Sequence, residues 1–591
     1  MRYMQHGSDY EVQDRSGLLR RAGRIGRPLL WPAVGAFTAA ALGTAARLAG
    51  PLAVGAGIDR GVAEGDKQIV TTAALVFIVL LVVQYVFVKI SRYGIAWVGE
   101  KYLLNLRSVV FRHLIRSDTA FFSRSKSGVL VSRMTSDIES LQEFAGDGAV
   151  MAVSNGLTVI GVAIAMVLVD WQMAVSTFAV IAVLIGVSVI FQRQAAKAYE
   201  QVRERIGRVL AGLQEGIAGV RVVQAFSQEQ VQATSFGRVN ESHYRAHMSA
   251  AKAISWYFPA VGFLRVVAIA AVLVIGGLRV IDGSLTFGTL VVFLLYLDWF
   301  FQPIVNLANV YNLLQAAIAA LGKLFNLLDV KAHVVERPGA YDLADPVAGE
   351  ITLSGVTFGY DDETMVIQDV DLEIPAGQRL AVVGETGAGK STIAKLVLRY
   401  YDPQQGSVSI DGADLTDVTI DSRTDAIALI PQDGFLFNGT LRSNLAYGAP
   451  DASDEDVWNV LRAMGIDDWV RDLPDGLETQ VRERGGRFSA GERQLVALGR
   501  AFLDDPSVIV LDEATSNLDP ETELEVEGAL RVLLAGRTAI VIAHRLRSAE
   551  RADRAIMIGD GRIIADGTHA DLIESSDEYR LLVEVWERGM S

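Results

Sequence analysis

Nine consecutive residues decide the fold of the second half of this chain: Gly384, Glu385, Thr386, Gly387, Ala388, Gly389, Lys390, Ser391 and Thr392. They follow an apolar, strand-like run at 379–383 and precede a helical pattern that begins near Ser391. Glycines between a strand and a helix let successive backbone N–H groups face phosphate oxygens, and the helix start adds a positive dipole end. The pattern therefore predicts a P-loop, in which Lys390 reaches the β- and γ-phosphates of ATP and Ser391 binds Mg²⁺.

A second apolar run, at 507–511, ends in the acids Asp512 and Glu513. We expect Asp512 to hold Mg²⁺ through water and Glu513 to polarise the water that attacks the nucleotide. Phosphoryl transfer asks a protein mainly for positioning and for neutralisation of charge, and this set of residues supplies both. An acid pair after a lone strand would read as a solvated turn, but its place beyond a P-loop favours an ATPase.

The first half of the chain carries six apolar stretches, each near the roughly 20 residues that a spanning helix needs. They are 29–58, 69–93, 150–169, 173–192, 257–281 and 287–308. Buried helices of a soluble protein are the alternative, but the residues at 170–172 alone separate two of these stretches. Arg and Lys gather in the amino-terminal segment and in two long, polar, helix-like loops, 94–149 and 193–256. The positive-inside rule therefore puts both termini and both long loops in the cytoplasm.

The resulting fold class is an α-helical six-span transmembrane domain fused to an α/β P-loop ATPase domain. We expect the transmembrane domain at 1–328, a polar linker at 329–349 and the nucleotide-binding domain at 350–591. The length of 591 residues fits more than one hydrophobic core. The net charge of −15 argues against a nucleic-acid partner, and the absence of cysteine excludes disulfides and thiolate chemistry. The predicted location is the cell (inner or plasma) membrane.

The basic amino terminus lacks the apolar core of a secretory signal. Leucines among arginines near Arg20 and Arg24 predict a short helix on the cytoplasmic membrane surface, with a disordered basic tail as the alternative for the first dozen residues.

Three ionisable residues fall inside the predicted spans: Arg47, Arg265 and Asp298. Each costs at least ~2.5–3.5 kcal/mol at mid-depth in a bilayer, so each is expected to face the bundle interior or a wet cavity. One interpretation is a cavity that contacts an anionic or amphipathic cargo. The other is a structural ion pair or an interfacial side chain, and the sequence leaves both open.

With these elements in order, the chain resembles the ATP-binding cassette family, in its exporter-type half-transporter branch, from the first span to the end. Further motifs carry the resemblance: FGY at 358–360, PQD at 431–433, FSAGE at 488–492, SNLD at 516–519 and IAHR at 542–545. The resemblance implies that Tyr360 stacks on adenine, that Gln432 contacts Mg²⁺, and that His544 contacts the γ-phosphate. It also implies that Ser489 and Gly491 meet the nucleotide of an opposite subunit, and that Asp519 lies at the dimer seam.

The membrane half is similar to the family too. The segments 121–137 and 215–226 resemble the family's two cytoplasmic loops, whose tips would be coupling helices that transmit closure of the ATPase domains. The segment 480–485 resembles the one that contacts those helices, although Arg482 replaces the usual glycine.

The signature at 488–492 departs from the family's common Leu-Ser-Gly-Gly-Gln. Ala490 adds a methyl group where only glycine lets backbone approach phosphate freely, and Glu492 replaces a neutral amide with a negative charge. Both changes are expected to weaken the ATP site that this signature completes, whereas Glu513 is intact. The sequence therefore favours a heterodimer with a different half-transporter, with a homodimer that tolerates the variant as the alternative.

Three functions remain after these observations. The leading hypothesis is ATP-driven export of a lipid, a drug or another amphipathic molecule. The same fold could instead take up a siderophore or fatty acid, or act as a nucleotide-gated channel or regulatory subunit. Intact Glu513 and His544 argue against a regulator, and the six spans exclude a soluble P-loop kinase.

Overall fold

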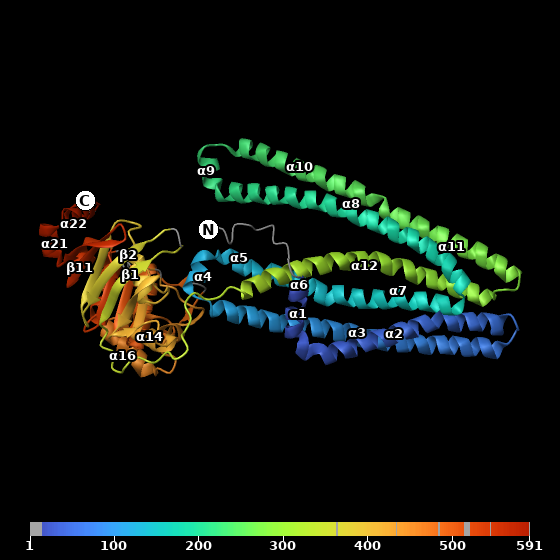
Figure 1. The fold of residues 1–591 in the computed structure, drawn as a ribbon, viewed down its shortest axis with the longest axis horizontal. Helices are drawn as coiled ribbons and strands as arrows, with labels where there is room; N and C mark the ends of the chain where they lie inside the picture. The colour runs from blue at the N-terminus through green and yellow to red at the C-terminus, as the bar shows by residue number, and fades with distance from the viewer. Residues whose placement is uncertain are drawn as a thin grey trace. The chain divides into compact units, whose positions relative to one another are not determined.

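The computed structural model describes residues 15–361, 364–432, 434–482, 485–512, 520–543 and 545–589. The chain forms two compact units: one contains the chain up to Arg116 and Ser125–Val330, and the other contains Ser117–Arg124 and the chain from Lys331 onward. In Figure 1 the first unit is a bundle of long helices, and the second is a sheet-based body. The predicted fold class, a six-span helical domain fused to an α/β ATPase domain, is confirmed.

The helical unit consists of α-helices joined by short 3-10 and π segments. In chain order these are α1 (Arg15–Gly26), η1 (Arg27–Leu29), α2 (Leu30–Ala56), η2 (Gly57–Val62), α3 (Lys67–Ile115), α5 (Ser127–Ser132), η3 (Arg133–Asp137), α6 (Ile138–Glu143), η4 (Phe144–Gly148), α7 (Ala149–Val169), α8 (Trp171–Ala218), α9 (Val220–Ala225), α10 (Glu229–Ser255), α11 (Tyr257–Ile281) and α12 (Phe287–Leu328). The helix predicted in the basic amino-terminal segment is α1, and the residues before it lie outside the described ranges.

Six helical segments in the described part of the chain are long and apolar enough to span a membrane, and each contains one of the predicted stretches. Helix α3 has 49 residues and α8 has 48, which corresponds to roughly 70 Å each at 1.5 Å per residue. The hydrocarbon core of a bilayer is only about 30 Å thick. Both helices therefore continue well beyond the membrane, as the helix-like character of the long loops predicts.

The three short connections between spans each end in a side chain that caps the next helix. Asp66 accepts a hydrogen bond from the backbone N–H of Gln68 before α3, and Asp170 accepts one from Met173 before α8. Thr286 does the same for Thr289 before α12. Caps of this kind satisfy backbone donors that the first turn of a helix leaves unpaired, so the sequence itself marks where each returning helix begins.

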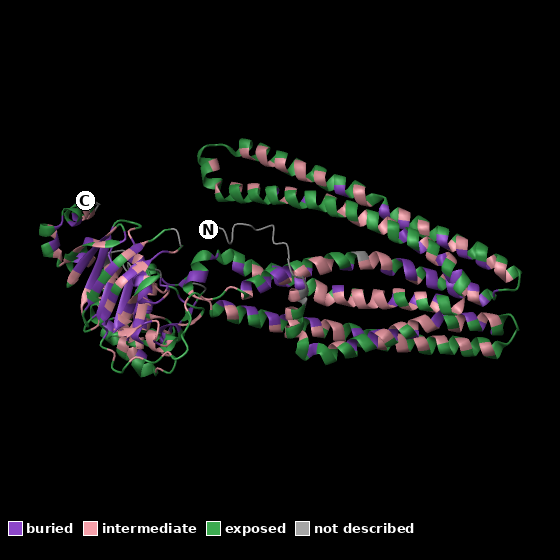
Figure 2. Ribbon diagram, in the orientation of Figure 1, coloured by how far each residue is buried: buried purple, intermediate pink, exposed green. Residues whose placement is uncertain are grey.

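The helices pack in pairs, and Figure 1 shows α2 beside α3 and α8 beside α10. The bundle core contains Phe293, Tyr296 and Leu297 of α12, all fully buried. The hydroxyl of Tyr296 donates to the Leu48 carbonyl of α2 at 2.6 Å, which fixes α12 against α2. Many residues of the spans are exposed (Figure 2), and large apolar side chains are among them, as expected for surfaces that face lipid.

The described residues of the second unit form three sheets. Their strands are β1 (Ile351–Phe358), β2 (Ile367–Ile374), β3 (Arg379–Gly384), β4 (Gln405–Ile410), β5 (Ala413–Asp414), β6 (Ile427–Ile430), β7 (Gly439–Thr440), β8 (Gln480–Val481), β9 (Val508–Asp512), β10 (Thr538–Ile542), β11 (Arg554–Gly559) and β12 (Arg562–Gly567). The six-stranded sheet has the order β12-β11-β3-β10-β9-β6, and all pairs except β11–β12 are parallel. An antiparallel sheet has the order β2-β1-β4-β5, and β7 pairs with β8.

The helices of this unit cover and extend the sheets. They are α4 (Thr119–Arg124), α13 (Lys390–Val397), α14 (Ile420–Ala426), α15 (Leu441–Leu445), α16 (Asp454–Met464), α17 (Asp467–Asp472), η5 (Gly476–Glu478), α18 (Ala490–Asp504), α19 (Pro520–Leu533), α20 (Leu546–Glu550), α21 (His569–Ser575) and α22 (Asp577–Gly589).

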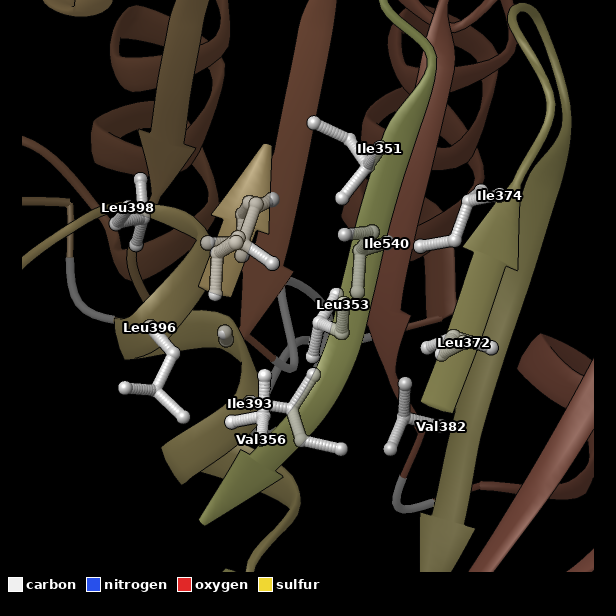
Figure 3. Packing of buried hydrophobic residues seen from close by; sticks show 14 of the residues in the cluster. Ile351, Leu353, Val356, Leu372, Ile374, Val382, Ile393, Leu396, Leu398 and Ile540 are labelled. Carbon is white, nitrogen blue, oxygen red and sulfur yellow. The ribbon is translucent and has the colours of Figure 1, made fainter. Parts of the chain in front are cut away.

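The main core of the second unit lies between the antiparallel sheet and the larger sheet. Figure 3 shows Leu353 and Val356 of β1 beside Ile393 of α13, with Val382 of β3 in the same cluster. These side chains are completely or almost completely buried. Removing a buried aliphatic side chain of this kind costs about 2–5 kcal/mol, so the cluster holds the strand and the helix that flank the P-loop in fixed positions.

Candidate nucleotide site and membrane cavity

The P-loop joins the end of β3 to the start of α13, as the sequence predicts. Gly384, Gly387 and Gly389 have φ angles of +145°, +89° and +110°, which side chains other than glycine adopt only with strain. A Cβ atom on Gly389 would lie 2.7 Å from Ile367 Cδ1, and one on Gly384 would collide with the Ile558 carbonyl oxygen. Gly384 and Gly389 are therefore required both by conformation and by space, and Gly387 by conformation alone.

Lys390 is the first residue of α13, and its side chain turns back into the loop. The buried amine donates to the carbonyl oxygens of Gly384 at 2.7 Å and Glu385 at 2.9 Å. Glu385, Thr386 and Gly387 are exposed. A cation thus lies beneath an exposed loop at a helix N-terminus, which is the arrangement that binds phosphate groups. The residues of this loop therefore fit the phosphate groups of a nucleoside triphosphate.

The opposite end of α13 is stabilised by Arg423. Arg423 donates to the carbonyl oxygens of Leu398 at 2.9 Å and Arg399 at 3.2 Å, just past the last turn. Cations at a helix C-terminus oppose the negative end of its dipole. Burial and the neighbouring Arg399 cation both lower the pKa of Arg423, and burial raises the pKa of Tyr400.

Tyr360, the predicted adenine-stacking residue, lies against the P-loop helix. Its hydroxyl is 3.1 Å from Thr392 Oγ1, and Lys395 donates to the same hydroxyl at 3.3 Å. The ring is in edge contact with Phe358 and Tyr401, with centroids 5.2 and 5.3 Å away. The structure therefore brings Tyr360 and the P-loop together, although they are far apart in sequence.

A segment of the first long loop belongs to the same site, and sequence reasoning did not place it there. Ala120 of α4 is fully buried in the core of the second unit. Ser123 Oγ is 2.9 Å from the Tyr401 hydroxyl, and Arg124 donates to the Tyr360 carbonyl oxygen at 2.8 Å. Helix α4 therefore holds the backbone of the predicted adenine-contacting residue.

Asp512 and Gln432 lie at the same edge of the large sheet as the P-loop. Strand β10 lies between β3 and β9, and Ile542 pairs with Val382 on one side and Asp512 on the other. Gln432 comes two residues after the end of β6, the strand on the far side of β9. Carboxyl ends of parallel strands are where open α/β sheets bind ligands. The topology thus gathers the P-loop, one acid and one amide at a single edge.

The signature begins helix α18. Ser489 is the N-cap, and its hydroxyl accepts from the backbone N–H of Glu492 at 3.1 Å. Glu492 returns the contact, because its carboxylate accepts from the Ser489 N–H at 2.6 Å. Its other oxygen accepts from the indole N–H of Trp469 at 2.9 Å. Ser489 and Ala490 are exposed, whereas Gly491 is buried.

These contacts change the interpretation of Glu492. The sequence suggests a negative charge that opposes the triphosphate, but both carboxylate oxygens accept hydrogen bonds within the chain. The carboxylate also lies at the positive end of the α18 dipole, in a capping box. We infer that Glu492 mainly stabilises the start of α18. The argument for a weakened signature then rests on Ala490.

Three predicted site residues lie outside the described residues: Glu513, Asp519 and His544. Their roles stay predictions.

The ionisable residues of the spans separate into two arrangements. Arg265 of α11 and Asp298 of α12 form an ion pair. Arg47 of α2 instead lies over the ring of Trp299, with 4.5 Å between the guanidinium carbon and the ring centroid. Arg47 and Trp299 line a cavity of about 270 Å³ between α2, α3 and α12.

Comparison with known proteins gives a consistent result. Residues 34–304 match the family model described as the ABC transporter transmembrane region, and residues 367–516 match the model described as ABC transporter. The chain is 33% identical to the uncharacterised ABC transporter ATP-binding protein YknV of Bacillus subtilis over 93% of this chain and 91% of that protein. It is 34% identical to an ATP-dependent lipid A-core flippase of Syntrophus aciditrophicus, over 82% and 80% of the two chains.

Among solved structures, a bacterial Atm1-family ABC exporter with ATP bound superposes with a TM-score of 0.76 and 27% identity, covering 98% of this chain and 99% of the other. The chain belongs to the ABC transporter family, with the exporter fold. It is a multi-pass membrane protein with a cytoplasmic ATPase domain that binds ATP and couples its hydrolysis to transport.

Proposed function

We propose that this chain is one subunit of a dimeric exporter of amphipathic molecules, lipids or drug-like compounds, and that its partner is a different half-transporter. The observation that carries the proposal is the fusion of six spans, which contain charged side chains, to a sheet edge that gathers the P-loop, Asp512 and Gln432, with Tyr360 against the P-loop helix. Similarity to a lipid flippase supports an amphipathic cargo.

The proposed site divides its roles among the residues of that edge. Bound Mg²⁺ would neutralise charge on the nucleotide, and oxygen ligands suit it. The chain's own residues bind the phosphates, stack on the base and orient the attacking water. By role, these residues are Tyr360 for adenine; Gly384, Glu385, Thr386, Gly387, Ala388, Gly389, Lys390, Ser391 and Thr392 for the phosphates; Ser391, Gln432 and Asp512 for Mg²⁺; and Glu513, His544 and Gln432 for catalysis.

A second subunit follows from surfaces that this chain leaves exposed. We propose that Ser489, Gly491 and Asp519 meet a nucleotide held by the partner, and exposure of Ser489 supports this arrangement. Helix α9, at the tip of the second long loop, has no buried residue, and Val222 and the adjoining Phe226 are 62% and 71% exposed. Apolar side chains gathered at a loop tip favour a docking surface.

The preference for a different partner rests on Ala490, the exposed first residue of α18. Its methyl group occupies the place where the signature backbone would approach the partner's nucleotide. A homodimer would then contain two ATP sites with this signature. In a heterodimer, the P-loop, Asp512 and Glu513 of this chain would instead face a partner signature that has glycine at the position of Ala490.

The experiment is ATP hydrolysis by the full chain in lipid nanodiscs, alone and together with the half-transporter that copurifies with it. The proposal predicts weak hydrolysis alone and a rise of about tenfold or more with the partner. Full activity of the chain alone would overturn the heterodimer. Direction is measured in sealed vesicles with the ATPase domain outside, where export predicts ATP-dependent accumulation of a fluorescent lipid in the lumen.

A further inference from the structure

The cavity beside Arg47 combines apolar walls with two polar side chains. Its walls are mostly apolar, from Phe77 and Leu80 of α3 and Trp299 of α12, and the polar side chains are Arg47 and Gln84. Among the residues that the structure describes, Arg47 forms no ion pair and Gln84 no side-chain hydrogen bond. The cavity thus presents a cation and an amide whose polar groups face no partner within the described chain.

Arg47 is too deep for its charge to reach the membrane surface easily. It lies 18 residues after the start and 11 residues before the end of the predicted apolar stretch 29–58, and 11 residues of helix rise about 16 Å, which is about half the thickness of the hydrocarbon core. An arginine side chain can extend its charge toward an interface only near a helix end. Arg47 therefore needs a partner at its own depth.

The ion pair on the neighbouring helices indicates that a partner for Arg47 would be an anionic oxygen. Arg265 has Asp298 as its counter-ion, and the next residue of α12, Trp299, stacks with Arg47 instead. An aromatic face attracts a cation but leaves the N–H donors at the guanidinium edge available. The donors of Arg47 are suited to an anionic oxygen that comes from outside the chain.

The walls of this cavity are held by close packing. Tyr296 is fully buried, and it anchors α12 to α2 through the Leu48 carbonyl oxygen, one residue from Arg47. Gly50 of α2 lets the Phe77 ring approach so closely that an added Cβ atom would be 3.1 Å from Phe77 Cε2. These contacts hold the three helices at fixed spacing around Arg47, as a preorganised binding site requires.

We propose that the Arg47–Gln84–Trp299 cavity binds the anionic headgroup of an amphipathic molecule, with its apolar tail against α3. The inference rests on the proposed export function and names the class of cargo: a carboxylate, sulfate or phosphate on a hydrocarbon tail. The N–H donors of Arg47 and Gln84 bind the anionic oxygens, while the Trp299 ring stacks on the face of the Arg47 guanidinium.

The test is photolabelling of the purified full-length transporter, with its copurifying partner, in phosphatidylcholine nanodiscs without ATP. The probe is phosphatidic acid with a diazirine in its acyl chain, and the readout is the labelled fraction of the peptide that contains residues 77–84. Loss of a charge-assisted hydrogen bond in a low-dielectric site predicts that Arg47→Gln lowers this labelling by about tenfold. Arg47→Lys is expected to retain part of it.

Arg60→Gln is the matched control, because it removes the same charge from the same span at an exposed position outside the cavity. We expect it to label like the wild type. Gln84→Leu provides a second variant without a charge change, with an expected loss of about threefold to tenfold. Equal labelling of Arg47→Gln and the wild type would overturn the proposal.

Competition identifies the source of the anion. Unlabelled phosphatidic acid represents a membrane lipid, and dodecanoate represents a water-soluble amphipathic anion. Competition by either supports the proposal and names the source, whereas equal competition by an uncharged lipid, diacylglycerol, overturns it. Labelling needs no ATP, so it tests binding separately from transport. Selective labelling together with no lipid transport in the vesicle assay would contradict the export function and leave this inference standing.

Discussion

Replacing Glu492 distinguishes between two accounts of the signature. If its charge opposes the triphosphate, Glu492→Gln restores the common amide and raises ATP hydrolysis. If Glu492 caps α18, the same change removes a favourable interaction. The carboxylate accepts hydrogen bonds from the Ser489 N–H at 2.6 Å and the Trp469 indole at 2.9 Å, so the structure favours the second account.

The size of the effect follows from those contacts. Loss of an N-terminal cap costs about 0.5–2 kcal/mol, and an unpaired, partly buried donor at Trp469 adds about 1 kcal/mol. Glu492→Ala is therefore expected to destabilise the folded state by about 1.5–3 kcal/mol. Glutamine keeps one acceptor and loses the charge, which leaves about 0.5–1.5 kcal/mol. For hydrolysis we expect Glu492→Gln to stay within about twofold of the wild type, since the charge already has partners.

The assay is hydrogen exchange of the peptide that starts α18 in the full-length protein, together with steady-state ATPase activity of the assembled transporter. Trp469→Phe is the matched variant, because it removes one donor to the carboxylate and leaves the charge in place. We expect faster exchange in all three variants, with Glu492→Ala the fastest. An increase of fivefold or more in ATPase activity for Glu492→Gln, with unchanged exchange, would refute the capping account.

Three further predictions concern other parts of the chain. Gly389→Ala is expected to weaken ATP binding by at least about tenfold in a nucleotide titration, because φ is +110° and the new Cβ atom would lie 2.7 Å from Ile367. At Gly387 no atom lies within 4 Å of an added Cβ atom, so Gly387→Ala introduces only backbone strain. Its loss of ATP affinity in the same titration should be smaller. Tyr360→Ala should raise the ATP concentration for half-maximal activity by about tenfold, since stacking of an aromatic ring on a base is worth about 1–3 kcal/mol. Tyr360→Phe keeps the ring and should raise that concentration by less than about threefold. Equal effects of the two substitutions would exclude the stacking role. Asp137→Ala should destabilise the membrane unit by about 1–3 kcal/mol, because the buried carboxylate accepts hydrogen bonds from Arg133 at 2.8 Å and Lys323 at 2.9 Å. Thermal unfolding in nanodiscs measures this effect. The control is Glu204→Gln, which breaks an exposed ion pair and is expected to shift the unfolding midpoint little.

The elements that the sequence predicts well are those set by local chemistry. The P-loop follows from glycine spacing between a strand and a helix, and the spans follow from apolar length. The caps at Asp66, Asp170 and Thr286 were not predicted, although they are local contacts in which each side chain bonds within three residues of itself.

The contacts that sequence reasoning did not place join residues far apart in the chain. Arg124 bonds to the backbone of Tyr360, and Trp469 bonds to Glu492, and neither pair has a signal in local spacing. For the intramembrane charges, sequence alone left an ion pair and a cargo contact equally open. The structure separates them, since Arg265 has Asp298 and Arg47 has Trp299.

The most direct test of the central claim is single-turnover ATP hydrolysis by the assembled transporter carrying Glu513→Gln. If this chain supplies the working base of an ATP-driven pump, hydrolysis and vesicle transport fall together by at least about a hundredfold, while ATP binding stays within about threefold of the wild type. Lys390→Ala provides the contrast, because it is expected to weaken binding itself. Hydrolysis by Glu513→Gln at near the wild-type rate, or transport that continues without it, would contradict the account.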